Sequence, residues 1–131
     1  MRSDLSGERL DDLDPIAVEV IRNKLEGIAN EMQFSLLRSA FSPIVKEGLD
    51  ASASLFTIEG ETLSQSISIP IHLGTLIPIV NKILECHPIE SLVDGDIFIM
   101  NEPYLEGTHL PDIAIMMPVF FEKHLLGFSA A

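Results

Sequence analysis

The sequence has little of what disulfides, nucleic-acid contacts and membrane spans require. A single cysteine, Cys86, permits no internal disulfide, which fits a reducing cytoplasm. Lysine and arginine number 8 against 20 acidic residues, and the net charge of −12 argues against nucleic acid or an anionic membrane as partner. No secretory signal opens the chain, and the longest apolar run, residues 113–121, is too short for the roughly 20 residues of a spanning helix. We therefore expect a soluble, cytoplasmic protein.

Two further absences concern chemistry and domain organisation. The chain contains no G-x-x-x-x-G-K-[ST] motif, and Gly107-Thr108 alone is too slight to bind the phosphates of ATP. Any ATP chemistry must therefore lie elsewhere. Internal repeats and low-complexity linkers are also absent from the sequence, so we expect a single domain.

The composition is strongly apolar for a chain of this size. Of the 131 residues, 47% are hydrophobic, and the mean hydropathy of +0.31 is high for a free-standing domain. This surplus predicts surfaces that other parts of a larger subunit cover. Residues 1–13 differ from the rest, because they form an acidic leader that we expect to be solvated and flexible.

A long helix is expected to begin at Asp14. Asp14 is a suitable N-cap, Pro15 suits the first turn, and Pro43 sets the latest end. Apolar residues at three- and four-residue steps predict a stripe that faces the core, namely Ile16, Val20, Ile21, Leu25, Ile28, Met32 and Leu36. After this helix, residues 53–58 and 61–65 are expected to form two strands joined at Glu59-Gly60, a hairpin signal.

A second helix is expected over residues 75–86, with Pro78 in its first turn and His87-Pro88 ending it. Its inward residues should be Leu76, Val80, Ile83 and Leu84. Further strands are expected at residues 97–100, 113–120 and 125–130, the last two joined through Glu122-Lys123. The predicted fold class is α+β, with a long N-terminal helix, a second helix and a mixed or antiparallel sheet, forming a partial domain of a larger subunit.

The loop between the strands at residues 97–100 and 113–120 concentrates polar side chains. It reads N-E-P-Y-L-E-G-T-H-L-P-D from Asn101 to Asp112, and loops held by strands can direct several polar groups at one ligand. His109 and Asp112 stand out because imidazole and carboxylate are both ligands of zinc and manganese. The alternative is an ordinary surface turn in which His109 bonds to backbone and Asp112 caps the next strand. A catalytic metal needs about three protein ligands, so this pair alone is incomplete.

Other polar residues give weaker signals. His72, expected just before the second helix, is a candidate acid/base group, with a helix-entry histidine as the alternative. Asp50 and Ser52 could orient substrate, but alternation along residues 49–55 equally places them on a solvated strand face. Three residues are assigned structural roles: Cys86, expected to be buried, His87 and His124.

Short motifs follow one another along the whole chain. They are D-P-I at Asp14, F-S-P-I-V-K-E at Phe41, L-D-A-S at Leu49, I-P-I-H-L-G at Ile69, G-D at Gly95, N-E-P-Y at Asn101 and G-T-H-L-P-D at Gly107. Their order and spacing resemble the beginning of the hydantoinase B/oxoprolinase family. That family includes B-type subunits of ATP-dependent N-methylhydantoinases, 5-oxoprolinases, and alpha subunits of acetone and acetophenone carboxylases. The resemblance implies that residues 14–131 are the amino-terminal part of such a domain.

The resemblance also implies roles for individual residues. His109 and Asp112 match the histidine and aspartate that bind a divalent metal in the family, zinc or manganese, with a further ligand expected beyond Ala131. Catalytic roles are implied for His72 and Asp50, and substrate contacts for Asn101, Tyr104 and Thr108. Four positions depart from the family pattern: Gly48, Ala51, Glu102 and Glu106 stand where it has Arg, Phe, Asp and Gly. These departures bear on substrate contact more than on the fold.

The function implied by the resemblance is ATP-coupled hydrolysis of cyclic amides. An A-type subunit or domain binds ATP and phosphorylates the amide carbonyl, and the B-type part uses its metal to open hydantoin or 5-oxoproline-like lactam rings. The protein would then be a hetero-oligomer in the cell, and residues 1–131 alone would be inactive. Two alternatives stay open: an alpha-type subunit of an ATP-dependent ketone carboxylase, and a non-catalytic truncated homologue that docks on an A-type partner. A free-standing metallohydrolase is disfavoured by the incomplete ligand set.

Overall fold

The fold is α+β, as predicted. The computed structural model describes residues 14–67, 70–105 and 110–131, except the side chains of residues 70–73 and 105, so the acidic leader lies outside the described part. The elements are α1 (Pro15–Ser39), α2 (Pro43–Gly48), β1 (Ser54–Phe56), β2 (Thr62–Gln65), α3 (Pro70–Cys86), β3 (Phe98–Met100), β4 (Ala114–Phe121) and β5 (His124–Ala130), with 3-10 turns η2 (Ile89–Ser91) and η3 (Pro103–Leu105). None of the helices in these ranges is long and apolar enough to cross a membrane.

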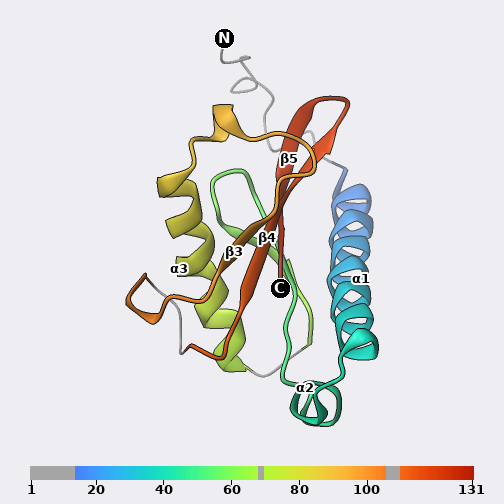
Figure 1. The fold of residues 1–131 in the computed structure, drawn as a ribbon. Helices are drawn as coiled ribbons and strands as arrows, with labels where there is room; N and C mark the ends of the chain where they lie inside the picture. The colour runs from blue at the N-terminus through green and yellow to red at the C-terminus, as the bar shows by residue number, and fades with distance from the viewer. Residues whose placement is uncertain (1–13, 68–69, 106–109) are drawn as a thin grey trace.

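The five strands form one sheet in the order β2-β1-β5-β4-β3, and every neighbouring pair is antiparallel. Of the two sheet types expected, the antiparallel one is therefore observed. The β1–β2 and β4–β5 hairpins lie where the sequence places them, although β1 is shorter than expected. Glu122 and Lys123 both have positive φ, as a tight two-residue turn requires. Figure 1 shows α3 on one side of the sheet and α1 on the other.

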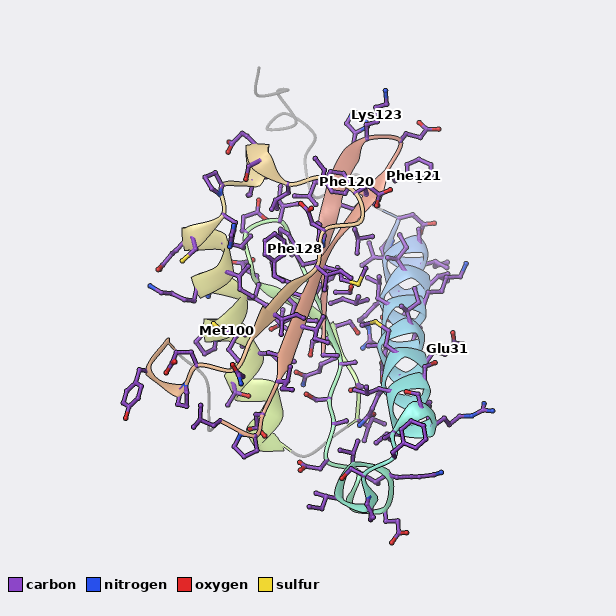
Figure 2. The ribbon with its side chains drawn as sticks, in the orientation of Figure 1. Glu31, Met100, Phe120, Phe121, Lys123 and Phe128 are labelled. Atoms are coloured by element: carbon purple, nitrogen blue, oxygen red, sulfur yellow. The ribbon has the colours of Figure 1, made fainter. Side chains whose placement is uncertain are left out.

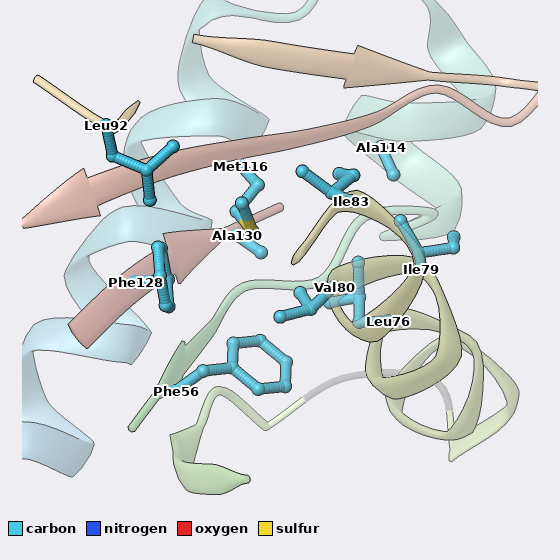
Figure 3. Packing of buried hydrophobic residues seen from close by; sticks show 10 residues of the cluster. All are labelled: Phe56, Leu76, Ile79, Val80, Ile83, Leu92, Ala114, Met116, Phe128 and Ala130. Carbon is cyan, nitrogen blue, oxygen red and sulfur yellow. The ribbon is translucent and has the colours of Figure 1, made fainter. Parts of the chain in front are cut away.

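The hydrophobic core lies between α3 and the sheet. Phe56, Met116 and Phe128 from three strands pack against Leu76, Val80 and Ile83 of α3, as Figure 3 shows at close range. The predicted inward positions of α3 are confirmed, with Leu84 partly buried against the same cluster. On β4, buried and exposed residues alternate, so one face of this strand supplies the core and the other does not.

α3 begins at Pro70 rather than at Thr75, so the predicted start was wrong. Pro78 lies inside the helix and not in its first turn. Proline lacks the N–H that would bond to the carbonyl of Gly74, and an internal proline normally costs stability. Here burial of Leu76, Val80 and Ile83 offsets that loss. As a consequence, the backbone of His72 belongs to the first turn of the helix instead of preceding it.

α1 has the predicted start, because the Asp14 carboxylate accepts a hydrogen bond from the Ile16 N–H at 3.0 Å. The predicted core stripe was wrong. Ile16, Val20, Ile21, Ile28 and Leu36 are exposed, Leu25 and Met32 are half-buried, and the buried residues are Ala29, Gln33 and Leu37.

The helix docks through polar contacts that an apolar pattern does not reveal. The Gln33 side-chain amide donates to the Ala51 carbonyl at 2.9 Å, and Asn30 Oδ1 accepts from the Ile67 N–H at 3.0 Å. Small Ala29 allows close approach on the same face. Apolar periodicity identifies an apolar face but does not determine what covers it.

Two more local predictions need correction. Cys86 is exposed rather than buried, because α3 ends at this residue and the chain then turns away through Pro88. The short helix α2 was not expected, although Ser42 followed by Pro43 is a helix-start signal. His87 is structural as predicted, since its ring packs on Phe98 with a centroid separation of 4.7 Å.

Candidate active site

A cavity of about 610 Å³ lies at one end of the sheet. The start of β1, the end of β5, the start of β4 and the end of β3 meet there, because these strands are antiparallel neighbours. Ala131 pairs with Ile115 through two backbone hydrogen bonds and also lines the cavity. Met100, labelled in Figure 2, closes the wall at the end of β3. The remaining walls come from α3 and from the region around α2.

Three of the predicted site residues line this one cavity: Asp50, Asn101 and Asp112. They come from separate segments, one before β1 and the other two from the ends of the β3–β4 connection. Asp50 and Asp112 are half-buried and Asn101 is exposed. The fold therefore gathers two carboxylates and one amide that are far apart in the sequence, which is the usual construction of a binding site.

The segment that carries Asp50 is held tightly. Leu49, at the end of α2, has φ 56° and ψ 31°, a left-handed conformation that is uncommon for a leucine. Ala51 N–H donates to the Leu49 carbonyl at 2.8 Å, and the Ala51 carbonyl accepts from Gln33. Strained backbone of this kind persists only where neighbouring contacts fix it, and it is common at functional sites.

Ser52 follows directly and is buried. Ser66 Oγ accepts a hydrogen bond of 3.0 Å from the next residue, Ala53, and so ties this segment to the end of β2. Ser52 lines the cavity, and β1 begins only at Ser54. The alternative that Asp50 and Ser52 lie on a solvated strand face is therefore wrong.

The two stems of the polar loop are joined at its base. Asn101 Nδ2 lies 3.5 Å from the Leu110 carbonyl oxygen, a long contact across the loop. The carboxylate of Glu102 accepts a hydrogen bond of 3.2 Å from the Tyr104 N–H and so caps the turn η3. Glu102, which departs from the family pattern, thus has a local structural task in this chain.

The structure does not place every predicted residue. Thr108 and His109 lie outside the described residues, as does the side chain of His72. Tyr104 is 94% exposed and is not among the residues that line the cavity. Sequence reasoning missed Thr75 and Ser42, which contribute further hydroxyl groups to the lining. The S-P start of α2 was the only available signal for Ser42, and nothing in the sequence singled out Thr75.

The donor set can be tested for its fit to a divalent metal. Carboxylate and amide oxygens are suitable ligands for a divalent cation, and Asp50, Asn101 and Asp112 supply them around one cavity. Within residues 14–67, 70–105 and 110–131, no three His, Cys, Asp or Glu residues are grouped closely enough to hold a metal ion. The chemistry therefore fits, while a full ligand set would need residues beyond those described.

The rest of the lining is apolar. It comprises Leu36, Ile44, Val45, Leu76, Ile79, Met100, Pro111, Ile113, Ala114 and Ala131, with Ala51 beside Asp50. Leu76, Ile79 and Ala114 belong to the core, so the floor of the cavity is fixed by packing. A concave apolar wall with a few converging polar groups is typical of a small-molecule site.

Comparison with known sequences supports one family. The family model described as hydantoinase B/oxoprolinase matches residues 14–131. The chain is 39% identical over 120 residues to an uncharacterised protein of Methanocaldococcus jannaschii, which covers 90% of this chain and 21% of that protein. It is 35% identical over 118 residues to 5-oxoprolinase 1 of Arabidopsis thaliana, covering 90% of this chain and 9% of that one. It is also 34% identical over 121 residues to a Pseudomonas protein named as the B-type subunit of a D-/L-hydantoinase, with 89% and 20% covered.

Two solved structures share the fold. The nucleotide-free structure of an acetone carboxylase matches 92% of this chain and 16% of its own, with 26% identity and a TM-score of 0.80. An ATP-dependent caprolactamase from Pseudomonas jessenii matches 91% of this chain and 20% of its own, with 28% identity and a TM-score of 0.71. The chain thus spans about a fifth or less of the length of the relatives it matches.

Proposed function

Because the chain belongs to the hydantoinase B/oxoprolinase family, we propose that it is part of the metal-dependent subunit of an ATP-coupled hydrolase that opens hydantoin or 5-oxoproline-like lactam rings. The observation that carries this proposal is the single cavity shared by Asp50, Asn101 and Asp112. The names of two relatives, a 5-oxoprolinase and a B-type hydantoinase subunit, support the hydrolytic branch. An ATP-dependent caprolactamase among the structural neighbours supports a cyclic amide as substrate.

Ring opening breaks the C–N bond of the amide and adds one water, giving a carboxylate and an amine. In our proposal, Asn101, Tyr104 and Thr108 contact the substrate, and Asp50 and His72 handle protons at the attacking water and the departing nitrogen. A lactam amide is unreactive, so the proposal includes ATP-driven activation of the carbonyl oxygen before water attacks. ATP then leaves as ADP and phosphate, and a second water balances its hydrolysis.

The proposed metal is zinc or manganese, held by His109 and Asp112. When bound, it would supply Lewis-acid polarisation and a lowered pKa of water. A third ligand is proposed from residues that follow Ala131 in the longer subunit. Ala131 lines the cavity, so the next residues of a longer chain would start at the site.

We propose an A-type subunit or domain as the ATP-binding partner, in a cytoplasmic hetero-oligomer. The sequence contains no glycine-rich phosphate-binding motif, and its net charge of −12 would not attract a free nucleotide. One relative is named as one subunit of a hydantoinase, which supports a divided enzyme.

A ketone carboxylase is the second candidate, because the acetone carboxylase structure has the higher TM-score of the two neighbours. A non-catalytic homologue that docks on an A-type partner is the third. The distinguishing experiment is to purify the natural full-length subunit and measure ring opening with and without ATP and the A-type partner, together with its metal content. ATP-dependent ring opening by the metal-loaded complex is expected. Turnover by the lone subunit without ATP would refute the coupling, carboxylation of ketones without ring opening would select the carboxylase, and a metal-free inactive complex would select the docking role.

A further inference from the structure

One wall of the cavity exposes apolar side chains that the core does not use. Ile44 on α2 is 68% exposed and Ile113, just before β4, is 62% exposed, although both line the cavity. Leu36, near the end of α1, is 38% exposed in the same lining. An apolar side chain open to solvent inside a concave surface has apolar area left to bury, and a ligand can bury it.

The polar side of the same cavity carries negative charge without a basic residue. Asp50 and Asp112 are the charged residues, and the described part of the lining includes no lysine, arginine or histidine. Even with a divalent cation between them, two carboxylates leave this part of the site without excess positive charge. A carboxylate on the substrate would therefore meet like charges and find no cationic partner among these residues.

We propose that this site prefers an electrically neutral cyclic amide with an apolar substituent over an anionic one such as 5-oxoproline. The amide ring faces the side of Asp50, Asn101 and Asp112, and the substituent packs on Ile44 and Ile113. This inference rests on the proposed function and narrows it, because hydantoin and 5-oxoproline-like rings are separated by the charge and shape of the wall. Ile44 and Ile113 are then specificity-determining residues that take no part in bond breaking.

The test uses the full-length subunit with its A-type partner and ATP. Values of kcat/KM are compared for hydantoin, isobutyl-substituted hydantoin and 5-oxoproline. Since an apolar group in a fitting pocket is worth at least about tenfold in kcat/KM, the isobutyl compound should exceed hydantoin by about that factor or more, and 5-oxoproline should be the poorest. Ile44→Ser and Ile113→Ser should abolish most of the isobutyl advantage while leaving turnover of unsubstituted hydantoin within about twofold.

Val93→Ser is the matched control, because Val93 is also an exposed apolar residue, at 60%, but does not line the cavity. It should leave the substrate preference unchanged. Preference for 5-oxoproline would overturn the inference while the proposed hydrolase stands. An isobutyl advantage that survives both serine substitutions would also overturn it, since the wall would then be covered by protein instead of substrate. If no ring is opened at all, the proposed function itself fails, and the inference fails with it.

Discussion

Gln33 in the middle of α1 and Ala51 beside the cavity are joined by a hydrogen bond of 2.9 Å, from the side-chain amide to the backbone carbonyl. Gln33 is only 5% exposed, so the contact is largely shielded from water. Asp50 and Ser52 flank Ala51 in the chain. The position of both cavity residues therefore depends on a polar group of a distant helix.

Replacing Gln33 should loosen that segment. Gln33→Ala leaves the Ala51 carbonyl without this donor, and we expect the free energy of unfolding to fall by about 1–3 kcal/mol, measured by chemical denaturation. Asn23→Ala is the control, because Asn23 is an exposed amide on the same helix whose side chain donates to Glu19. Its effect should stay within about 0.5 kcal/mol. Equal effects of the two substitutions would show that the Gln33 contact contributes nothing special.

Two glycines should respond to alanine in opposite directions. A Cβ at Gly127 in β5 would overlap the backbone carbonyl oxygen of Phe56 in β1, so Gly127→Ala should destabilise the protein by about 1–3 kcal/mol. A Cβ at Gly27 in α1 would meet no atom within 4 Å, and Gly27→Ala should stabilise it by about 0.5–1 kcal/mol. Thermal denaturation of both variants gives the signs, and a neutral Gly127→Ala would contradict the close β1–β5 contact.

Glu19 on α1 should titrate well below an ordinary glutamate. Hydrogen bonds from Arg22 and Asn23 lower its pKa from 4.5 to about 2, and the Arg22 Nη2 to Glu19 Oε1 distance is 2.7 Å. A folded-state pKa below the unfolded value means that this pair stabilises the protein above about pH 4.5 and that its contribution is lost as the pH falls from there towards 2. NMR titration of the Glu19 carboxyl should show the low value, and Arg22→Ala should return the pKa towards 4.5. Lys24→Ala should leave it low, and an ordinary pKa in the unmodified protein would contradict the pairing.

The proposed metal ligands can be separated from the fold. In the full-length subunit, His109→Ala and Asp112→Ala should each remove the metal and the activity while the circular dichroism spectrum is retained, because loop ligands bury little apolar surface. His87→Ala is the control. Its ring contact with Phe98 is structural, so metal content should be unchanged and the stability loss should be no more than about 1 kcal/mol. Metal that persists in both loop variants would show that the ligands are other residues.

Residues 1–131 by themselves should bind zinc and manganese weakly. The described part of the chain holds no group of three candidate ligands, and a stable site needs about that number. Calorimetric titration of the 131-residue chain should show no saturable site at micromolar metal. A tight site with one metal per chain would contradict the expectation that the third ligand follows Ala131.

The fold was largely predictable because its signals are local. The Asp14-Pro15 start, the Glu59-Gly60 and Glu122-Lys123 turns, and the alternation along β4 each act within a few residues. Errors arose where a local signal had two meanings. Pro78 suits a first turn, yet the helix continues past it because the residues around it are buried. The α1 stripe is apolar, yet the helix docks through Asn30 and Gln33.

The site was less predictable because its assembly depends on contacts that are distant in sequence. Asp50 and Asp112 could be selected by resemblance to a family, but their shared cavity follows from the strand order, which no motif encodes. Thr75 had no signal, because its place in the lining depends on how α3 packs on the sheet. Exposure of Cys86 likewise depends on where the chain turns after the helix.

The strand order also has a consequence for how the molecule folds. β1 and β2 are close neighbours in the chain, as are β4 and β5, whereas β1 joins β5 by pairing Ser54 with Ala130. Local hairpins close quickly and distant pairings slowly, because more chain entropy is lost before any contact compensates. Pulse-labelling hydrogen exchange should therefore protect β4 and β5 before β1, and simultaneous protection would contradict this order. Asp50 and Asp112 lie on opposite sides of that late junction, so the binding site does not exist in any folding intermediate that precedes it.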